Sequence, residues 1–432
     1  MTIAPAQQRN VLLLGADLAL FMAALGLLGP VTLVPLFVSK VTDDPLAIGA
    51  LSAAFHLGWL PQLFTAGWVE RSPRKLPMAL VFTGFERLPV LGLALCALAA
   101  TSITPGLLIA LVLLCRFGQT AAGGLATTPW LDLVARVVPA ERRGRFMGNT
   151  TMVGHLLGAG AAALAAPLLE WLGYPYGFAA CFGLAFLILM LGWVPLFLIA
   201  EPLGGELRPA RPFREELAEL PAVLGRDRAF RRFLIGLSLA ALGTMSTGFL
   251  VVYAVGPLGA TDELAAWYTA VVLLAQVAAN PGLGWLADRH GFSAVGQAAA
   301  LAGVGLSAIA LAAPDPLWLV AAFGMLGVGQ AGTMLARLTG PMEFAPPDRR
   351  PTYVALSSAL VSLVAAAAPL IGGQIIVQLG YGWLFVASAG FSLAGAIVLA
   401  GCGKPVADGP GSRWHSLRDA EPPERLVDGS RR

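Results

Sequence analysis

Long apolar runs, each followed by a short polar segment, recur along the whole chain. About 20 apolar residues in a helix are enough to cross the hydrocarbon core of a bilayer. Hydropathy therefore predicts about twelve membrane-spanning helices. These predicted spans cover residues 11–38, 45–69, 76–100, 106–133, 145–169, 176–200, 232–256, 263–287, 292–313, 316–342, 352–378 and 382–402.

The composition indicates the same class of protein. Of the 432 residues, 57% are hydrophobic and 12% are charged, whereas a soluble domain has about 25% charged residues. Pattern and composition together predict an all-α, polytopic membrane protein. The chain has no long basic run with interleaved aromatic residues, so nucleic-acid binding is not expected.

Several function classes lack their characteristic residues in this sequence. The four cysteines lie in apolar runs without the spacing of metal ligands, so we expect neither a metal site nor a disulfide. No nucleotide-binding loop and no Ser/His/Asp grouping is present. We therefore expect no cofactor, and we expect the protein to be neither an enzyme nor an ATP-driven pump.

Two long polar segments interrupt or follow the apolar spans. The first lies between the sixth and seventh predicted spans and is rich in proline, arginine and glutamate, and the second forms the C-terminal tail. The expected organisation is a six-helix bundle at 1–200, a cytosolic loop at 201–231, a second six-helix bundle at 232–402 and a disordered cytosolic tail at 403–432.

Basic residues gather in every second loop. If the N-terminus is cytosolic, the cytosolic segments hold the arginine clusters, whereas the opposite loops hold a single lysine, Lys40, together with several acids. Cytosolic loops of membrane proteins carry an excess of lysine and arginine. The asymmetry predicts an integral protein of the cytoplasmic membrane with both termini in the cytosol.

Short segments repeat between the two halves. Residues 139–143 (PAERR) resemble residues 346–350 (PPDRR), and the LGY of residues 172–174 recurs at 379–381, in each case 207 residues later. Parallel repeats of six spans are a known transporter plan, with the substrate near the midplane between the halves. We therefore expect two pseudo-symmetric bundles.

Two loops carry the clearest motif. Residues 66–75 read AGWVERSPRK, and residues 284–292 read GWLADRHGF. Both resemble the G-x-L-A-D-R-x-G-R-K signature of the major facilitator superfamily of secondary transporters, and the resemblance covers nearly the whole chain. The first copy has Ala66 and Pro73 at the glycine positions, and the second lacks the basic pair. The resemblance implies a cytosolic gate that joins the halves when the protein opens outward, formed by Glu70, Arg71, Arg74, Lys75, Asp288 and Arg289.

Charges around the end of the fourth span are expected to extend this gate. Asp132 and Arg136 lie at the end of the span, and Arg142 and Arg143 follow in the next loop. The family places a similar cluster here, which favours a charge relay that locks the gate. The alternative is a set of solvated charges at the membrane interface.

The fourth span carries a second resemblance, to the R-x-x-Q-G-x-G-A pattern of proton-coupled members of the family. The matching residues are Arg116, Gln119, Gly123, Gly124 and Ala126, with Thr120 in place of the first glycine. The resemblance implies proton coupling. The fifth span lacks the Gly-Pro step typical of drug–proton antiporters, which argues against antiport.

Ionisable residues inside spans are costly and are candidates for function. Arg116 is favoured as a residue that binds an anionic substrate or tunes a proton-carrying acid, rather than as a structural arginine. Glu86 and Arg87 point about 100° apart on one helix. For them an ion pair with a neighbouring helix is favoured over proton carriage by Glu86. Asp17 could neutralise either Arg116 or Arg87.

Neutral polar residues inside spans form a second set of candidates for the substrate or proton pathway. The alternative is that they tie helices together through hydrogen bonds. Arg337, near the end of the tenth span, is the expected counterpart of the charges in the first half. The neutral candidates are Gln119, Gln276, Asn280 and Gln330.

The sequence therefore predicts a secondary active transporter of a small organic solute that works by alternating access and is coupled to protons. Export of an amphipathic compound is favoured over import of an anionic nutrient or metabolite. The alternative function from a different class is that of a non-transporting receptor or assembly factor with the same fold. The expected partners are the solute, protons and membrane lipids, and the expected state is a monomer.

Overall fold

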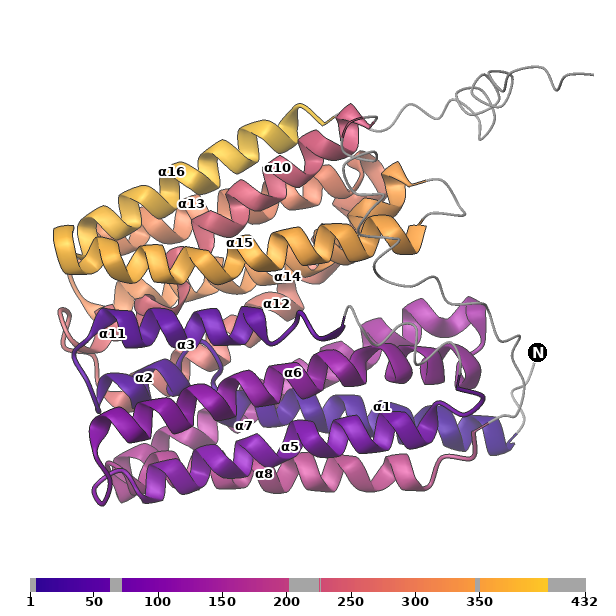
Figure 1. The fold of residues 1–432 in the computed structure, drawn as a ribbon, viewed down its shortest axis with the longest axis horizontal. Helices are drawn as coiled ribbons and strands as arrows, with labels where there is room; N and C mark the ends of the chain where they lie inside the picture. Colours follow the sequence, from indigo (N-terminus) through magenta and orange to yellow (C-terminus); the bar gives the residue numbers. More distant parts are fainter. Residues whose placement is uncertain (1–4, 63–71, 202–224, 226, 346–349, 403–432) are drawn as a thin grey trace, which may run out of the picture.

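The computed structural model describes residues 5–62, 72–201, 225, 227–345 and 350–402 (Figure 1). Every regular element in these ranges is a helix, which confirms the predicted fold class. Eleven helical segments among the described residues are long and apolar enough to cross a membrane. The protein is an all-α polytopic membrane protein.

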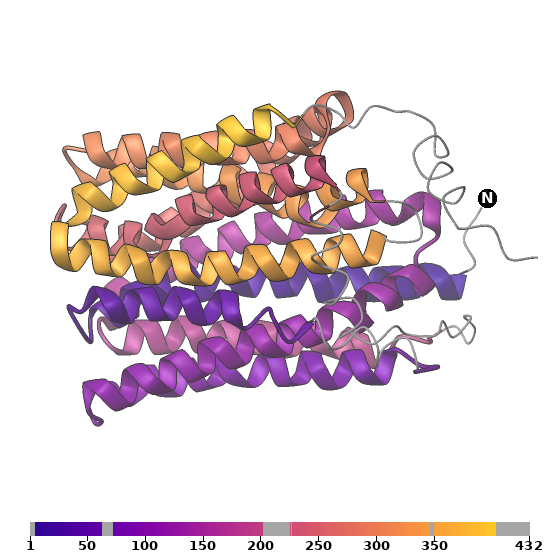
Figure 2. The same ribbon diagram turned by 45° about the horizontal axis from the view of Figure 1, so that its top comes forward.

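Two groups of helices lie side by side (Figure 1, Figure 2). The first group consists of α1 (Pro5–Leu28), α2 (Leu33–Ser39), α3 (Pro45–Leu57), α5 (Leu76–Leu98), α6 (Pro105–Val137), the short η1 (Ala140–Arg142), α7 (Arg143–Leu172) and α8 (Tyr176–Phe197). The second group consists of α10 (Arg228–Gly243), η2 (Thr244–Phe249), α11 (Leu250–Val255), α12 (Asp262–His290), α13 (Phe292–Ala312), η3 (Pro316–Trp318), α14 (Leu319–Phe344), α15 (Arg350–Leu379) and α16 (Tyr381–Ala400). The exact boundaries of the two bundles stay a prediction.

The first predicted span is made of two helices. Helix α1 ends at Leu28, and Gly29 has a φ of +52°, a left-handed conformation that glycine adopts without steric cost. Pro30 follows and has no N–H to continue the helical ladder. The chain turns and continues as α2 in the same span. The seventh span is divided in a similar way, because six residues of 3₁₀ helix, η2, separate α10 from α11.

The second predicted span, 45–69, is only partly described. Helix α3 is a 13-residue apolar helix that begins after Asp44, whose side chain accepts a hydrogen bond from the Leu46 N–H. The helix ends at Leu57, and residues 63–71 lie outside the described residues. The structure therefore shows the first half of this span.

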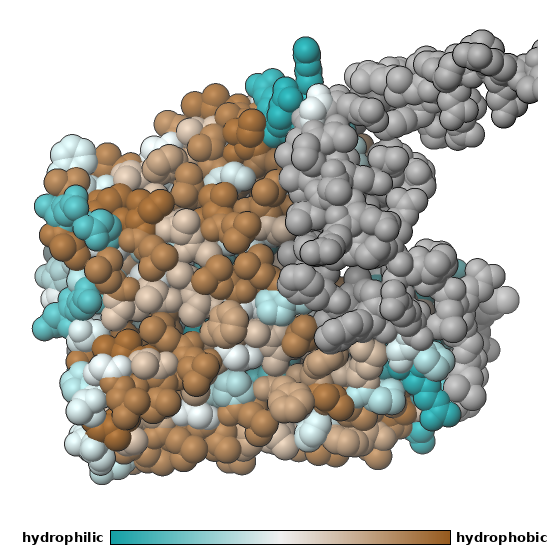
Figure 3. Space-filling model, in the orientation of Figure 1, coloured by the Kyte–Doolittle hydropathy of each residue, from teal (hydrophilic) through white to brown (hydrophobic). Residues whose placement is uncertain are grey.

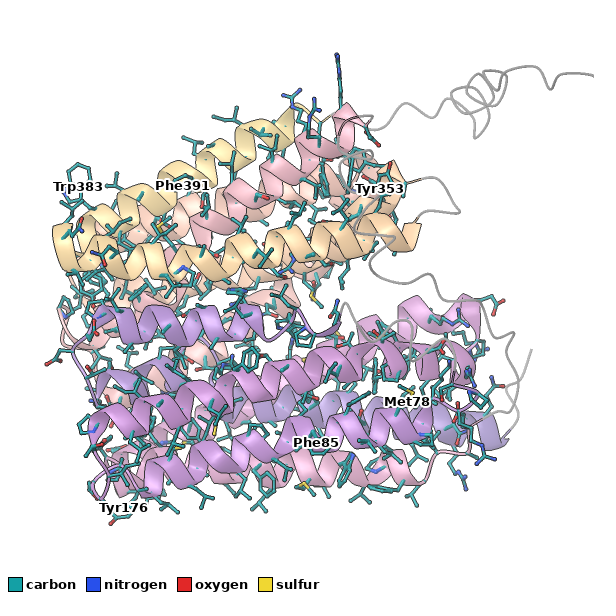
Figure 4. All side chains as sticks on the ribbon, in the orientation of Figure 1. Met78, Phe85, Tyr176, Tyr353, Trp383 and Phe391 are labelled. Atoms are coloured by element: carbon teal, nitrogen blue, oxygen red, sulfur yellow. The ribbon has the colours of Figure 1, made fainter. Side chains whose placement is uncertain are left out.

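The outer surface has the pattern expected for a protein in a bilayer. Figure 3 shows hydrophobic residues over the middle of the molecule and hydrophilic residues toward its two ends. Phe85 and Phe391 point outward from the middle of the groups, and Tyr176 and Trp383 lie near one end (Figure 4). Tyrosine and tryptophan are enriched where a membrane meets water.

The two ends of the molecule differ in charge. We call the end that carries the N-terminus and Arg74, Arg136 and Arg143 the basic end, and the end that carries Lys40 and Asp262 the far end. Along the chain, each of the spanning helices runs from one of these ends to the other (Figure 1).

Among the described residues, the largest hydrophobic cluster joins the two groups toward the far end. There, one cluster of buried residues joins Phe37 and Phe178 of the first group to Phe249, Tyr268 and Phe323 of the second. Toward the basic end, separate clusters pack within each group, one around Leu14 and Leu133 and the other around Phe230 and Phe233. Apolar burial therefore holds the groups together at the far end.

Candidate functional site

A buried ion pair lies inside the first group. Arg87 of α5 is 1% exposed and donates from Nη2 to the Oδ1 of Asp17 on α1 over 3.0 Å. The other carboxylate oxygen of Asp17 accepts a hydrogen bond of 2.9 Å from the indole N–H of Trp130 on α6. The sequence left Arg116 and Arg87 open as partners of Asp17, and in the structure Asp17 pairs with Arg87.

The other two nitrogens of the Arg87 guanidinium also donate hydrogen bonds. Its Nε donates to the carbonyl of Leu189 on α8 over 2.9 Å, and its Nη1 donates to the carbonyl of Thr83 over 2.6 Å. The ring of Trp193 lies 5.9 Å from the guanidinium carbon. Arg87 thus ties α1, α5 and α8 together, in line with the structural ion pair expected from the sequence.

Glu86 points toward the motif of the fourth span. A Cβ atom added to Gly123 of α6 would lie 2.6 Å from the Oε1 of Glu86, so only glycine leaves room for this carboxylate. Among the described residues, no hydrogen bond or ion pair to the Glu86 carboxylate is found. The two neighbours therefore differ, because each guanidinium nitrogen of Arg87 donates a hydrogen bond, whereas no such bond to the Glu86 carboxylate is found among the described residues.

Arg116 lies in the middle of α6 and is 2% exposed. Its Nη1 donates to the side-chain oxygen of Gln119, and its guanidinium carbon lies 4.7 Å from the ring centre of Phe55 on α3. Among the residues that the structure describes, Arg116 forms no ion pair with an acid. Close packing of α3 against α6 at Gly58 and Thr120 holds this face of α6 toward the second predicted span.

In the second group, the candidate residues form mostly neutral contacts. Gln276 of α12 donates to Gln330 of α14 over 2.9 Å, which links these two helices. Asn280 lies one helical turn further along α12 and is half-buried. Arg337 of α14 donates to the hydroxyl of Ser362 on α15 over 2.9 Å. In the described part of the chain, Arg337 also forms no ion pair.

A small cavity lies where the two groups meet. It measures about 60 Å³, and its wall includes His56 of α3 together with Thr244, Thr333 and Arg337 of the second group. Apart from His56, the cavity is lined by residues of α10, η2, α13, α14 and α15. It is the place where a charged side chain of the second group faces the first group.

At the basic end, four charged residues of the first group form one network. Asp132 lies 3.4 Å from the Nζ of Lys75 and 3.9 Å from Arg136, and Arg136 also contacts Glu201 over 3.0 Å. Glu201 accepts hydrogen bonds from the backbone N–H groups of Lys75 (2.7 Å) and Leu76 (3.1 Å), the first residues of α5. A carboxylate at a helix N-terminus is stabilised by the helix dipole.

Glu201 was not identified as a site residue from the sequence. It follows directly after the sixth span, at the start of a polar segment, where an acid has no periodic pattern to distinguish it. Its counterpart in the second group is Glu343, at the end of α14, whose two oxygens accept from the N–H of Phe292 over 3.2 and 3.1 Å. Each group therefore fixes the start of its third span with an acid from another span.

The other predicted gate residues are placed as follows. Glu70 and Arg71 lie outside the described residues. Arg143 donates to the carbonyls of Ala135 and Val138, and so caps the end of α6. Arg289 lies 4.9 Å from the ring centre of Trp285. Among the described gate residues, Arg74, Arg142, Asp288 and Arg289 have exposed side chains.

At the far end, polar contacts cross between the groups. Lys40, which follows α2, forms an ion pair of 2.8 Å with Asp262 at the start of α12. Deeper in the molecule, the hydroxyl of Thr32 shares a hydrogen bond of 2.5 Å with that of Thr269, and both residues are buried. The sequence identified Lys40 and Asp262 only as loop residues on the side opposite the arginines.

Small residues let the groups approach closely at the same end. A Cβ atom on Gly49 of α3 would lie 2.7 Å from the carbonyl oxygen of Pro369 on α15, and one on Gly373 would lie 3.0 Å from that of Pro45. One on Gly158 of α7 would lie 3.1 Å from Leu273 of α12. Contact between backbones at small residues is common in membrane helix packing.

Comparisons with known proteins agree with this architecture. Residues 233–420 match the sequence model described as Major Facilitator Superfamily. The solved nucleoside transporter NupG is similar in structure, with 13% sequence identity and a TM-score of 0.65, and the match covers 92% of this chain and 99% of that chain. No curated protein matches the chain.

Two further solved structures share the fold. A bacterial homolog of the human lysosomal transporter Spinster, in an inward-facing and unoccupied conformation, is 16% identical with a TM-score of 0.63, over 93% of this chain and 96% of that chain. The xylose transporter XylE from E. coli, in a partially occluded inward-open conformation, is 14% identical with a TM-score of 0.61, over 92% and 98%. The second half of the chain thus matches the model of the major facilitator superfamily, and the fold of these solved transporters extends over both halves.

Proposed function

We propose that the protein is a secondary active transporter that moves a small organic solute across the cytoplasmic membrane by alternating access. The observation that carries this proposal is the distribution of contacts between the two helix groups. At the far end an ion pair, a buried hydrogen bond, glycine contacts and a shared apolar cluster join the groups. Toward the basic end, the apolar clusters and the network around Glu201 each lie within one group.

This distribution supports an arrangement that is closed at the far end. If the arginine-rich end faces the cytosol, as the positive-inside rule favours, the arrangement corresponds to an inward-open state. Cysteine-accessibility labelling tests the orientation. A cysteine at Ser72 should react from the cytosolic side and one at Asp43 from the outside. Labelling of both from the same side would contradict the proposed topology.

The outward-open state requires the opposite exchange of contacts. We expect Asp288 to approach the start of α7 when the basic end closes, because an acid near a helix N-terminus gains about 0.3–1 kcal/mol from the helix dipole. Such a contact would be present in one state only, and would therefore shift the population toward that state. Asp288→Asn should consequently favour the inward-open state and slow transport.

Proton coupling is the second part of the proposal, with Glu86 as the proton carrier. The described acids inside the first group are Asp17 and Glu86, and Asp17 is held by Arg87 and Trp130. Glu86 has no such partner and lies against Gly123 in the motif shared with proton-coupled members. The preference for export over import stays a prediction.

Flux measurements in reconstituted liposomes test the transport function. A thermal-shift screen of the purified protein with metabolites and drugs would first supply ligands. The proposal predicts that a ligand found in this way crosses the liposome membrane, faster when a proton gradient is imposed, and that Glu86→Gln removes the effect of the gradient while binding persists. Binding without flux would instead support the rival reading as a receptor.

A further inference from the structure

Three of the described arginines, Arg87, Arg116 and Arg337, lie well away from the ends of the membrane-spanning helices, and their surroundings differ. Arg87 is surrounded by one acid, two carbonyls and an aromatic ring. Arg116 and Arg337 each donate one hydrogen bond to a neutral side chain, Gln119 and Ser362 respectively. In the described part of the chain, neither of these two arginines forms an ion pair.

An arginine that forms no ion pair costs free energy when it lies inside a membrane span. A charged side chain near the bilayer centre costs about 2.5–3.5 kcal/mol even by the lowest scales. A guanidinium group has five N–H donors, and the one identified side-chain hydrogen bond of Arg116 or Arg337 leaves most of them for another acceptor. By contrast, each of the three guanidinium nitrogens of Arg87 donates a hydrogen bond within the first group, and one of them binds an acid.

Arg337 borders open space. It lines the cavity of about 60 Å³ together with Thr244, Thr333 and His56. Arg116 is 2% exposed and is not among the residues that line this cavity.

His56 connects the two arginines in space. It lines the cavity beside Arg337, and its ring packs 5.1 Å from that of Phe55, over which Arg116 lies. The two arginines, one from each helix group, are therefore both linked to this histidine, Arg337 through the cavity wall and Arg116 through the Phe55 ring.

We propose that Arg337 and Arg116 together bind an anionic group of the transported solute, a carboxylate or a phosphate, in the space around His56. The planar fork of arginine matches the oxygens of both anions. Thr333 and Thr244, in the wall of the cavity, add hydroxyl groups that can donate to the same oxygens. This inference rests on the proposed transport function, to which it adds the substrate class.

A bound anion would also link the two helix groups. Arg116 belongs to the first group and Arg337 to the second, so an anion held by both interacts with the two groups at once. A ligand shifts a conformational equilibrium only by its difference in affinity between the states. An anion that needs both arginines has such a difference, because the distance between the groups changes during alternating access.

Binding of simple anions to the purified full-length protein tests the inference. The probes are succinate and inorganic phosphate, with uncharged succinamide as the control compound, all at constant ionic strength. The expected result is that at least one anion raises the unfolding temperature of the wild-type protein, whereas succinamide does not. Arg337→Gln and Arg116→Gln should each weaken that anion's apparent affinity by about tenfold or more, the loss expected for a hydrogen-bonded charge pair.

Arg232→Gln provides the matched control. Arg232 is an exposed arginine of α10 at the basic end that donates to the carbonyl of Val398. Its loss lowers the net charge equally and should leave anion affinity unchanged. If Arg116→Gln does not fold, Arg337→Gln alone tests the inference, because Arg337 is only half-buried and its replacement should be tolerated better. The inference is overturned if neither anion stabilises the wild-type protein, or if the arginine variants bind the anion as well as Arg232→Gln does.

Flux separates this inference from the transport proposal. A protein that binds the anion through both arginines but does not move it across liposomes contradicts transport and retains the anion site. A protein that carries a neutral solute with unchanged rate in Arg337→Gln retains transport and contradicts the anion site.

Discussion

The two ends of the molecule are built from different kinds of contact. At the far end, Lys40 and Asp262, Thr32 and Thr269, and the backbones at Gly49 and Pro369 join one helix group to the other. At the basic end, Glu201 and its partners Lys75 and Arg136 join helices of one group. The charged contacts at the basic end therefore hold the helices of one group together, whereas the contacts at the far end hold the two groups against each other.

The largest effect should come from breaking the internal ion pair of the first group. Asp17→Asn would leave the charge of Arg87 buried without an acid, which costs about 3–5 kcal/mol. The variant should therefore unfold at a clearly lower denaturant concentration in detergent. The double variant Asp17→Leu with Arg87→Met removes both charges and should recover most of the loss. Equal stability of Asp17→Asn and the wild-type protein would show that this pair does not hold the group together.

A second, smaller effect should be confined to the far end. Gly49→Ala places a methyl group 2.7 Å from the Pro369 carbonyl oxygen, and overpacking of this kind costs about 1–3 kcal/mol. The far end should open more often, so that a cysteine at Ser52, which lies opposite Gly248, reacts faster with a membrane-impermeant reagent. Gly148→Ala is the control, because nothing lies within 4 Å of the added atom. Equal labelling rates in the two variants would count against closure at Gly49.

Glu201→Gln should act on the basic end without changing the far end. The carboxylate accepts two backbone N–H groups and the Arg136 guanidinium, and loss of its charge should cost about 1–3 kcal/mol. Hydrogen exchange at the start of α5 should become faster, whereas the Ser52 labelling rate should stay constant. An increase in both rates would indicate that the two ends are not independent.

The smallest effect is expected for the ion pair at the far end. Lys40 and Asp262 are 31% and 21% exposed, and pairs that reach solvent contribute about 0–1 kcal/mol. Lys40→Ala should therefore raise far-end labelling by about fivefold at most. The exchange of charges, Lys40→Asp with Asp262→Lys, should restore the wild-type rate. A restored rate would assign the effect to the pair rather than to either side chain alone.

The sequence predicted the fold well because its signals are local. Apolar runs of the right length and alternating basic loops predict spans without knowledge of how the helices pack. The break in the first span has a visible cause in Gly29 and Pro30. The break in the seventh span does not, since Thr244 to Phe249 contain no proline and their 3₁₀ geometry forms in the packed structure.

The site could be predicted only in part, because partners in the interior are set by packing. Asp17 and Arg87 are 70 residues apart, and the sequence left Arg116 open as an equal partner for Asp17. That Glu201 fixes the start of α5 depends on where α8 ends in space. Likewise, the linkage of Arg337 and Arg116 to His56 follows from the way the two groups meet.

The most direct test of alternating access measures both ends in the same protein. In a background without the native cysteines, spin labels at Asp43 and Leu317 report on the far end, and labels at Gly144 and His290 report on the basic end; all four positions are exposed. Double electron–electron resonance in nanodiscs should show that conditions which lengthen the far-end distance shorten the basic-end distance. Distances that stay fixed, or that change in the same direction at both ends, would contradict alternating access.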